Sequence, residues 1–594
     1  MTDRLTHRGP DGRGTFINPG IGLGHRRLAI IDVAGGQQPL RGADERTVVA
    51  FNGEVYNYRE MKASLPGPWR TASDTEVFLR AYEAKGVAGL QDLVGMWGAA
   101  IWDGRDNSLV VVRDRLGVKP VYHAPLKGGG HAFASELRAL LELSEVDLSL
   151  DPEALEQLLT YRYVPAPRTL LAGIRKLVPG EVVRVGQDGL QSERYWTPRP
   201  KPDPIGDREA EDTFIELFDQ AVQAHLVSDV PVGLFLSGGV DSAALLQSMA
   251  RGTHCFTIGF QGGDRDDEIP LAAETCRHFG AIHHTTVIGP RDYISTFDTS
   301  VRHLEEPVLN DSALATYFLA QLARPHVKVV LSGQGADEPL AGYDRFKGEA
   351  LAPWYQQLPS SPSLSRWVEG SRAPLKLKRA VRALGESDDI RRAGRIYAVL
   401  QEEEKAWLMR PEVRRPDCVY DPLQRLHGEV PHLSALGRML YTDTRLWLPD
   451  DLLLVADKLS MAHGLEFRVP FLDHRLVQRL ESMPDAQKLR LSRRGFVTKA
   501  VHRRAMARRL PASVLQRKKR GFNNPMGQWL RGPLRAMLEE RLLDPSSPLI
   551  EWAQPKALRK LVDEHSSGAR DHRRALFLLL TIDAWMRLLR NRAL

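Results

Sequence analysis

The segment with the clearest chemistry in this chain is a glycine-rich loop, SGGVDS, at residues 237–242. It follows the apolar run VPVGLFL and precedes the apolar stretch AALLQSMA, a pattern that predicts a strand, a tight loop and a helix. Glycines let a backbone approach a ligand closely, and the free N–H groups of a helix N-terminus attract anions. A carboxylate in such a loop repels phosphate unless Mg²⁺ lies between them. The loop therefore predicts a nucleotide pyrophosphate site, and an ordinary strand–helix turn is the alternative. Its candidate residues are Ser237, Gly238, Gly239, Asp241 and Ser242.

A second Ser-Gly pair follows another β-branched run, in VKVVLSGQGADE at residues 327–338. Open α/β sheets bind ligands at the carboxyl ends of their strands, so two such strand ends can face one nucleotide. We expect Ser332 and Gly333 to contribute to that site and Asp337 to share Mg²⁺ with Asp241. A residue at the end of the CFTI run, Ile258, is placed to line an adenine pocket.

The elements that position these loops indicate two domains, because 594 residues are too many for one core. Residues 1–195 contain short strand-like segments between glycine-rich turns. The proline-rich stretch 196–209 reads as a linker. Strands and helices alternate from about 210 to 345, which predicts a doubly wound parallel sheet, and the chain is mostly helical beyond 350. The fold class expected is α/β and α+β, with a second domain spanning residues 210–594.

Composition favours a cytoplasmic enzyme with small-molecule substrates. No apolar run is long enough to span a bilayer, and the first residues lack the apolar core of a signal peptide. Cys255, Cys276 and Cys418 form no disulfide framework and no CxxC metal pair. We expect neither a membrane nor a nucleic acid as partner, and the sequence leaves a homodimer open.

A basic run at residues 490–520 holds 12 Lys and Arg and no Asp or Glu. Such a run could bind nucleic acid, so together with SGGVDS it leaves an RNA-modifying enzyme or a nucleic-acid binder as a competing hypothesis. Few aromatic residues interleave it, so we favour a solvated helix face near an anionic substrate site.

Motifs along nearly the whole chain resemble the glutamine-hydrolysing asparagine synthetase family. SGGVDS itself is similar to the pyrophosphate loop of ATP-pyrophosphatase enzymes. The C-terminal motifs are SGQGADEPLAGYD (332–344), DDLLLVADKLSMAHGLEFRVPFLDH (450–474) and RKKRGFNNP (517–525). The N-terminal motifs are HRGPDGRG (7–14), LGHRRLAIID (23–32), FNGEVYNYRE (51–60), SDTE (73–76) and RDRLGVKPVY (113–122).

The resemblance implies two coupled activities. An N-terminal glutamine amidotransferase domain of the Ntn-hydrolase αββα type, incomplete here, releases ammonia from glutamine. A C-terminal domain uses ATP and Mg²⁺ to adenylate the side-chain carboxylate of aspartate, and ammonia attacks the β-aspartyl-AMP to give asparagine. AMP makes the carboxylate a better electrophile, and cations stabilise the departing pyrophosphate.

The resemblance also assigns roles to individual residues. Leu236, Ile258, Ser332 and Gly333 match ATP contacts, Asp241 and Asp337 match the Mg²⁺ carboxylates, and Lys519 matches a lysine that steadies the reacting groups, with Lys518 as the neighbouring alternative. Arg27 matches the partner of the glutamine α-carboxylate, Asn52 and Gly53 the oxyanion hole, and Glu54 and Asp74 the groups around the α-amino end. For FNGE, a hairpin turn is the competing interpretation.

One departure from the family concerns the glutaminase nucleophile. In the family it is an N-terminal cysteine some tens of residues before HRGPDG, whereas no cysteine precedes Cys255 here. Thr2 has the wrong spacing to replace it. We expect either a start upstream of Met1 or a variant fed by ammonia or another amine, so glutaminase activity of this chain is in doubt.

The second departure is Gln334, at a position that is usually acidic and assists formation or use of the acyl-adenylate. A glutamine keeps the hydrogen bonds but carries no charge and takes up no proton. The alternative to aspartate amidation is therefore an amide or lactam synthetase of the same family that acts on another carboxylate.

Overall fold

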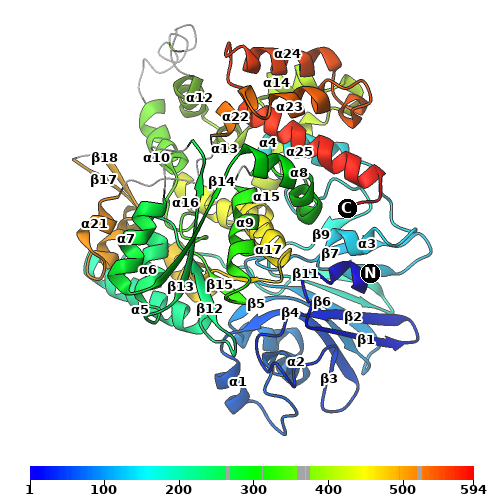
Figure 1. Cartoon of the computed structure of the whole chain (residues 1–594). Helices are drawn as coiled ribbons and strands as arrows, with labels where there is room; N and C mark the ends of the chain where they lie inside the picture. The colour runs from blue at the N-terminus through cyan, green and yellow to red at the C-terminus, as the bar shows by residue number, and fades with distance from the viewer. Residues whose placement is uncertain (263–267, 311, 358–367, 369–374, 494, 518–524) are drawn as a thin grey trace.

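The computed structural model describes residues 1–262, 268–310, 312–357, 368, 375–493, 495–517 and 525–594. Two sheets of different kinds organise these residues, an antiparallel one in the N-terminal part and a parallel one in the C-terminal part. The N-terminal part forms the blue base of Figure 1, and the last helices form the opposite end. The expected two-domain α/β and α+β fold, with a parallel sheet in the C-terminal domain, is confirmed.

The N-terminal domain is built on a six-stranded antiparallel sheet in the order β11-β10-β6-β5-β4-β3. Its strands are β3 (Leu40–Arg41), β4 (Thr47–Val55), β5 (Gly95–Asp103), β6 (Ser108–Arg113), β10 (Glu181–Gly186) and β11 (Gly189–Arg194). A hairpin and a three-stranded sheet accompany it, formed by β1 (Gly12–Asn18) with β2 (Ile21–Arg27), and by β7 (Tyr122–Pro125), β8 (His131–Ala134) and β9 (Arg175–Lys176).

Successive side chains of a strand point to opposite faces of the sheet, and this alternation explains where the polar residues of the sheet lie. Alternate side chains of β4, β5 and β6 pack against helices α1 (Tyr58–Ser64) and α2 (Asp74–Lys85). Asn52 and Glu54 therefore point to the opposite face. Asn52 and Gly53 lie inside β4, paired with Gly98 and Trp97 of β5, so FNGE is not a hairpin turn.

The C-terminal domain contains a five-stranded parallel sheet in the order β14-β13-β12-β15-β16. Its strands are β12 (Val232–Phe235), β13 (His254–Phe260), β14 (Ile282–Ile288), β15 (Val329–Leu331) and β16 (Glu466–Arg468). The first four match the strand-like runs of the sequence. The fifth, β16, was not predicted, because three residues between helices give no periodic signal.

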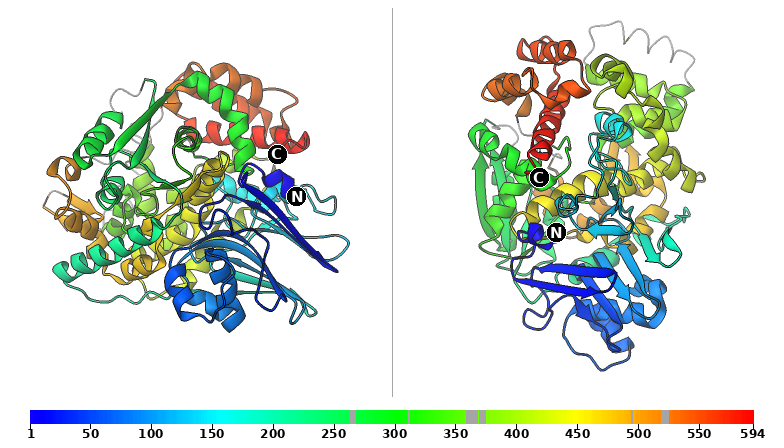
Figure 2. Two further views of the ribbon diagram at one scale, coloured as in Figure 1. Left: turned by 60° about the horizontal axis from the view of Figure 1, so that its bottom comes forward. Right: turned by 90° about the vertical axis from the view of Figure 1, so that its right-hand side faces the viewer.

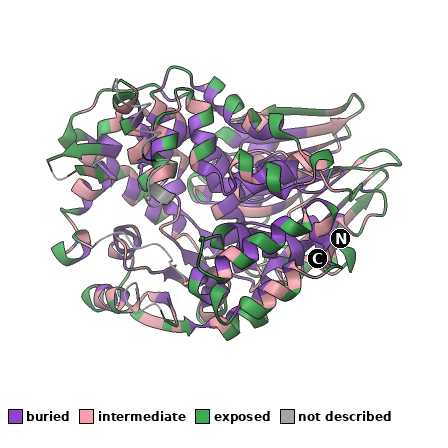
Figure 3. Ribbon diagram, turned by 90° about the horizontal axis from the view of Figure 1, so that it is seen from above, coloured by how far each residue is buried: buried purple, intermediate pink, exposed green. Residues whose placement is uncertain are grey.

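Helices cover both faces of this sheet, as expected of a doubly wound fold. One face packs against α5 (Asp207–His225), α6 (Val240–Gln247), α7 (Ile269–Phe279), α18 (His474–Ser482) and α20 (Ala500–Met506). The other packs against α9 (Ala313–Ala323) and α17 (Leu454–Met461). Figure 3 shows the buried interior that results, enclosed by exposed outer helix surfaces.

The remaining described helices pack around these sheets, and some of them, such as α4 and α25, are themselves largely buried (Figures 1 and 2). They are α3 (Leu137–Leu140), α4 (Pro152–Tyr161), α8 (Pro290–Leu304), α10 (Asp344–Gln356), α12 (Leu375–Leu384), α13 (Asp389–Tyr397), α14 (Glu402–Leu408), α15 (Asp421–Glu429), α16 (Ala435–Thr442), α19 (Asp485–Lys488), α21 (Ala512–Leu515), α22 (Met526–Arg531), α23 (Arg535–Leu542), α24 (Pro555–Ser566) and α25 (Arg573–Arg590). A hairpin of β17 (Leu489–Ser492) and β18 (Gly495–Thr498) precedes α20. No described helix has the length and hydropathy needed to cross a bilayer.

Buried ion pairs join the two domains. The Nη2 atom of Arg8 and the Nζ atom of Lys119 lie 2.7 and 3.2 Å from carboxylate oxygens of Asp457 in α17. Glu54 of β4 lies 3.1 Å from Arg468 of β16. Residues 196–206 between the domains have no helix or strand, and α5 begins at Asp207. Since these charges are withdrawn from water, each depends on its partner in the other domain.

Candidate functional site

The SGGVDS loop adopts the strand–loop–helix form that its sequence predicts. β12 ends at Phe235, and Gly239 caps the N-terminus of α6. The hydroxyls of Ser237 and Ser242 lie 3.0 Å apart, and the Ser242 hydroxyl also accepts the N–H of Ser237 at 3.1 Å. These hydroxyls therefore hold the loop in shape, and the N-terminal N–H groups of α6 face the cavity beside it.

The second Ser-Gly strand end lies against the first, as predicted. A Cβ atom at Gly333 would come within 3.1 Å of the Asp241 Cβ and 3.2 Å of the Ser242 N atom, so a side chain here would push the two loops apart by a few tenths of an ångström. Gln334 donates its backbone N–H to the Ser332 hydroxyl at 3.3 Å. Its side-chain Oε1 is buried and accepts no hydrogen bond from any described residue. Gln334 thus places a hydrogen-bond acceptor, Oε1, without a described donor in the wall of the cavity.

A lysine that sequence reasoning missed joins the two predicted metal ligands. Lys499 Nζ lies 2.7 Å from Asp241 and 2.9 Å from Asp337. Burial alone would raise the pKa of Asp241, but the Lys499 charge and the hydrogen bond with His502 outweigh it and hold that pKa well below its usual value. Burial would likewise lower the pKa of Lys499, and the two carboxylates raise it instead. Asp241 and Lys499 are therefore both charged.

The backbone is shaped to bring Lys499 to this position. Lys499 has a left-handed φ of 53° at the start of α20, and its N–H donates to the Leu340 carbonyl at 3.1 Å. A Cβ atom at Gly342 would lie 1.8 Å from Asp337 Oδ1 and 2.5 Å from the Lys499 Cε. In the sequence Lys499 is one cation of a basic run. The detectable signal was the buried pair Ala500–Val501 beside it, since a lysine next to buried residues needs an anionic partner.

The cavity in front of these residues has a volume of about 500 Å³. The predicted residues Leu236, Ile258, Ser332, Gly333 and Gln334 line it, together with the whole SGGVDS loop and Asp337. Apolar walls suit a purine ring, and the α6 N-terminus suits phosphates. Lys499 Nζ already lies between the oxygens of Asp241 and Asp337, and the other Asp241 oxygen, Oδ1, lies 3.2 Å from His502 Nε2. This oxygen-donor set fits Mg²⁺.

A second group of charged and aromatic residues lines the far wall of the cavity. Arg345 lies 4.4 Å above the Trp447 ring and 2.7 Å from Asp443. Arg162 lies 3.5 Å above the same ring and 2.6 Å from Asp451. Trp447, Asp443 and Asp451 belong to a π-helical segment, η5 (Asp443–Leu453), that links α16 to α17. Such segments are uncommon and often mark functional sites. Sequence reasoning missed this wall because its residues lie far apart along the chain.

Most cations of the basic run at 490–520 that the structure describes pair with acidic residues. Arg504, Arg508 and Arg509 pair with acidic residues of α5 at 2.6–2.8 Å. Arg517 donates to the Gly238 carbonyl at 3.2 Å and lies beside Glu274. These pairs favour the predicted helix face near an anionic site over a nucleic-acid groove. Lys519 and the alternative Lys518 lie outside the described residues.

A second cavity, of about 390 Å³, lies in the N-terminal domain. All five predicted glutamine-pocket residues line it, namely Arg27, Asn52, Gly53, Glu54 and Asp74. Thr2 lines it as well. Arg27 donates to the backbone carbonyls of Ile31, Asp32 and Val33 at 2.6–3.1 Å, which fixes its guanidinium. The Asn52 amide donates to the Ser135 hydroxyl at 3.2 Å. A Cβ atom at Gly53 would lie 2.1 Å from the Met96 carbonyl oxygen, so this position requires glycine.

The two carboxyls of this cavity are buried and resist ionisation. Burial raises the pKa of Asp74 to about 6, although its carboxylate accepts the Val55 N–H at 2.9 Å. Burial raises the pKa of Glu54 well above its usual range despite the neighbouring Arg468. Glu54 Oε2 makes no hydrogen bond with a described residue. An incoming ammonium group would add positive charge beside Asp74 and beside Glu54, which already lies 3.1 Å from Arg468.

Two family models match the chain. One, described as asparagine synthase, matches residues 213–587, and the other, a glutamine amidotransferase domain, matches residues 1–196. These ranges coincide with the domains that contain the two cavities.

Similar proteins of known description span nearly the whole chain. Asparagine synthetase [glutamine-hydrolyzing] 1 of Bacillus subtilis is 32% identical over 98% of this chain and 92% of its own length. A putative asparagine synthetase of Mycobacterium tuberculosis is 34% identical with the same coverage. Amidase chyE of Penicillium rubens is 25% identical over 91% of this chain and 86% of its own length. With both family models matched in order and relatives above 30% identity over almost the full length, this chain belongs to the asparagine synthetase family of glutamine-hydrolysing ligases.

Proposed function

We propose that this protein uses ATP to convert aspartate to asparagine through a β-aspartyl-AMP intermediate. In the first step the aspartate side-chain carboxylate attacks the α-phosphorus of ATP, and pyrophosphate leaves. In the second step ammonia attacks the acyl carbon, and AMP leaves. Membership in the asparagine synthetase family supports this assignment, as does the nucleotide-shaped cavity.

Each part of the cavity has a role in this proposal. The SGGVDS loop and the α6 N-terminus bind phosphate oxygens, and the apolar wall around Ile258 holds the adenine. Asp241 and Asp337 would hold Mg²⁺, which supplies charge neutralisation for the departing pyrophosphate. Lys499 contributes a fixed positive charge at the same place. Lys519, or Lys518, is proposed to approach the reacting groups.

The observation that carries the proposal is the Asp241–Lys499–Asp337 cluster beside the SGGVDS loop. A solvated surface would not keep two carboxylates and one ammonium ion in contact at this depth. The direct test is aspartate-dependent exchange of labelled pyrophosphate into ATP with Mg²⁺, followed by detection of asparagine when ammonium is added. Absence of both exchange and asparagine would contradict the proposal.

The nitrogen is proposed to come from ammonia or from glutamine bound in the N-terminal cavity. The fixed Arg27 guanidinium suits an α-carboxylate, and Glu54 with Asp74 suits an α-ammonium. Calorimetry with glutamine tests binding, and glutamate release tests hydrolysis. These two measurements separate a working pocket from a working nucleophile.

A second candidate is amide formation on a different carboxylate. Gln334 favours it, because a neutral side chain with a free Oε1 replaces the usual acid in the cavity wall. A panel of carboxylic acids in the pyrophosphate exchange assay decides between the two. If aspartate is the only acid of the panel that supports exchange, the protein makes asparagine. If only a larger acid supports exchange, the alternative holds.

A further inference from the structure

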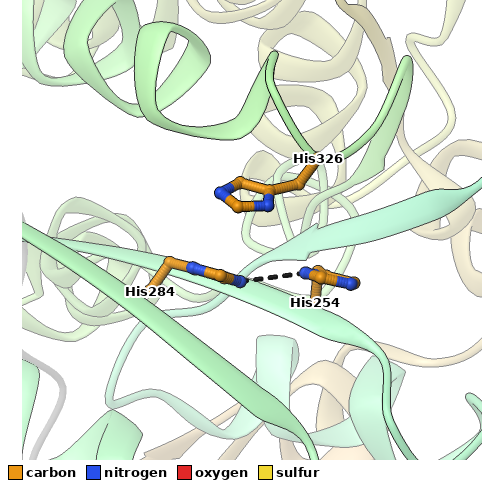
Figure 4. A group of neighbouring side chains, drawn as sticks. All are labelled: His254, His284 and His326. Atoms are coloured by element: carbon orange, nitrogen blue, oxygen red, sulfur yellow. Dashed lines mark hydrogen bonds between the residues drawn. The ribbon is translucent and has the colours of Figure 1, made fainter.

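Three histidines from three separate segments converge at the edge of the parallel sheet where its strands begin (Figure 4). His254 opens β13, His284 is the third residue of β14, and His326 lies in the connection from α9 to β15. The nucleotide residues lie at the carboxyl ends of the same strands. The cluster is therefore separate from both cavities described above.

The imidazole rings lie close enough to share one ion. One ring nitrogen from each histidine can be chosen so that all three lie within 4.8 Å of one another. His254 Nδ1 and His284 Nε2 are 2.9 Å apart, and the centroids of the His284 and His326 rings are 4.1 Å apart. Nitrogen ligands of a tetrahedral zinc ion lie about 3.4 Å apart, given Zn–N bonds of about 2.0–2.1 Å. The present nitrogen distances, from 2.9 Å to at most 4.8 Å, bracket that value.

The surroundings favour a cation over a plain aromatic stack. His326 follows the C-terminus of α9 and donates its N–H to the Ala323 carbonyl, where the helix dipole favours positive charge. His326 is exposed, which leaves a path for the ion and a place for a water ligand.

We infer that His254, His284 and His326 bind one divalent transition-metal ion, with Zn²⁺ as the best fit and water completing the coordination. Neutral imidazoles suit Zn²⁺, Cu²⁺ and Ni²⁺, whereas Mg²⁺ and Ca²⁺ prefer oxygen ligands. The molecule would then hold two different metals, one at each end of its parallel sheet. The bound ion would tie β13, β14 and the segment before β15 together. These strands lead to Ile258 and Ser332 of the nucleotide cavity.

The test uses full-length protein without a histidine tag, stripped with a chelator and then titrated with Zn²⁺ against a chromophoric competitor. We expect one ion per chain with a dissociation constant of about 10 µM or tighter, and a rise in Tm on binding. Titration with Co²⁺ should give the visible absorption of a tetrahedral nitrogen site. His326→Gln should weaken binding at least about tenfold, and His254→Gln and His284→Gln should do the same.

The matched control is His283→Gln. His283 is adjacent to His284 on β14 but points to the other face of the sheet, where it bonds the Thr257 hydroxyl at 2.9 Å. This variant should bind Zn²⁺ like the wild type. Circular dichroism of every variant checks folding. His326→Gln changes a solvent-exposed side chain, so it is the variant expected to disturb folding least. Failure of stripped wild-type protein to bind Zn²⁺ at 100 µM overturns the inference. Equal loss in the His283 control, or no loss in His326→Gln, overturns it as well.

Discussion

The two cavities of this protein hold paired carboxyl groups in opposite ways. In the nucleotide cavity, Asp241 and Asp337 contact the buried cation Lys499, and the pKa of Asp241 is held well below its usual value. In the N-terminal cavity, burial raises the pKa of Asp74 to about 6 and also raises that of Glu54. Asp241 is held ionised before any ligand arrives, whereas Asp74 and Glu54 would ionise more readily when a further cation joins them.

This difference matches the ligands that the cavities are proposed to bind. A triphosphate is strongly anionic, so its site needs fixed positive charge and metal ligands that never take up a proton. An amino acid brings its own ammonium group, which can pay the electrostatic cost of ionising buried carboxyls. The contrast predicts that changes in the nucleotide cavity act on catalysis, whereas changes in the N-terminal cavity act on ligand affinity and on pH dependence.

The largest effect is expected from Asp241→Asn. The substitution removes a metal ligand and one charge partner of Lys499, so pyrophosphate exchange should fall about 100-fold or more. Glutamine affinity, measured by calorimetry, should not change. Asp212→Asn, which alters an exposed acid paired with Arg508, serves as the control and should keep wild-type exchange. A variant at Asp241 that retains more than a tenth of the exchange rate would contradict the role of this carboxylate.

Lys499→Met tests the cation itself. Its loss removes the cation that Asp241 and Asp337 share, and breaking a buried ion pair costs about 3–5 kcal/mol in the free energy of unfolding. Mg²⁺ should restore stability to this variant more than to the wild type, because the ion neutralises the same two oxygens. Urea unfolding with and without Mg²⁺ measures both effects. Equal responses of the two proteins to Mg²⁺ would mean that the metal does not bind between Asp241 and Asp337.

Lys499 also illustrates what the sequence could predict. The loops around Ser237 and Ser332 follow long apolar strands, so local pattern was enough to place them at one sheet edge. Lys499 reaches the same site from the start of α20, through a left-handed backbone and a glycine at position 342 that lets it pass. Such a contact depends on tertiary packing, which leaves no periodic signal in the sequence.

The same limit applies to the wall around Trp447. Arg162, Arg345 and the η5 segment lie far apart along the chain, and they meet only because α4, α10 and η5 share one hydrophobic cluster. Strand β16 was too short to detect, although it carries Arg468, which links the parallel sheet to Glu54. Residues within a motif were therefore predictable, and residues brought together by packing were not.

A smaller effect is expected from Asp74→Asn in the N-terminal cavity. The amide keeps the hydrogen bond from Val55 but cannot ionise for an ammonium group, so glutamine affinity should fall about tenfold. Synthesis driven by added ammonium should stay within twofold of the wild type, because the nucleotide cavity is untouched. Asp44→Asn, at an exposed position, is the matched control. A parallel loss of ammonium-driven synthesis would show that the two cavities are not separable in this way.

The smallest effect concerns stability and pH at the same residue. The Asp74 pKa is about 6 in the folded protein and about 4 in an unfolded chain, so the folded state binds this proton more tightly. The stability that this provides is complete below about pH 4 and is lost as pH rises through about 6. Between pH 5 and 7 the wild type should therefore lose about 1 kcal/mol of unfolding free energy that Asp74→Asn does not lose.

Urea unfolding of both proteins across this range, without glutamine, measures the difference. Saturating glutamine should remove most of it, because the bound ammonium group makes the ionised carboxylate favourable. A difference that is independent of pH, or of opposite sign, would mean that Asp74 is already ionised in the folded protein and that the two cavities treat their carboxyl groups alike.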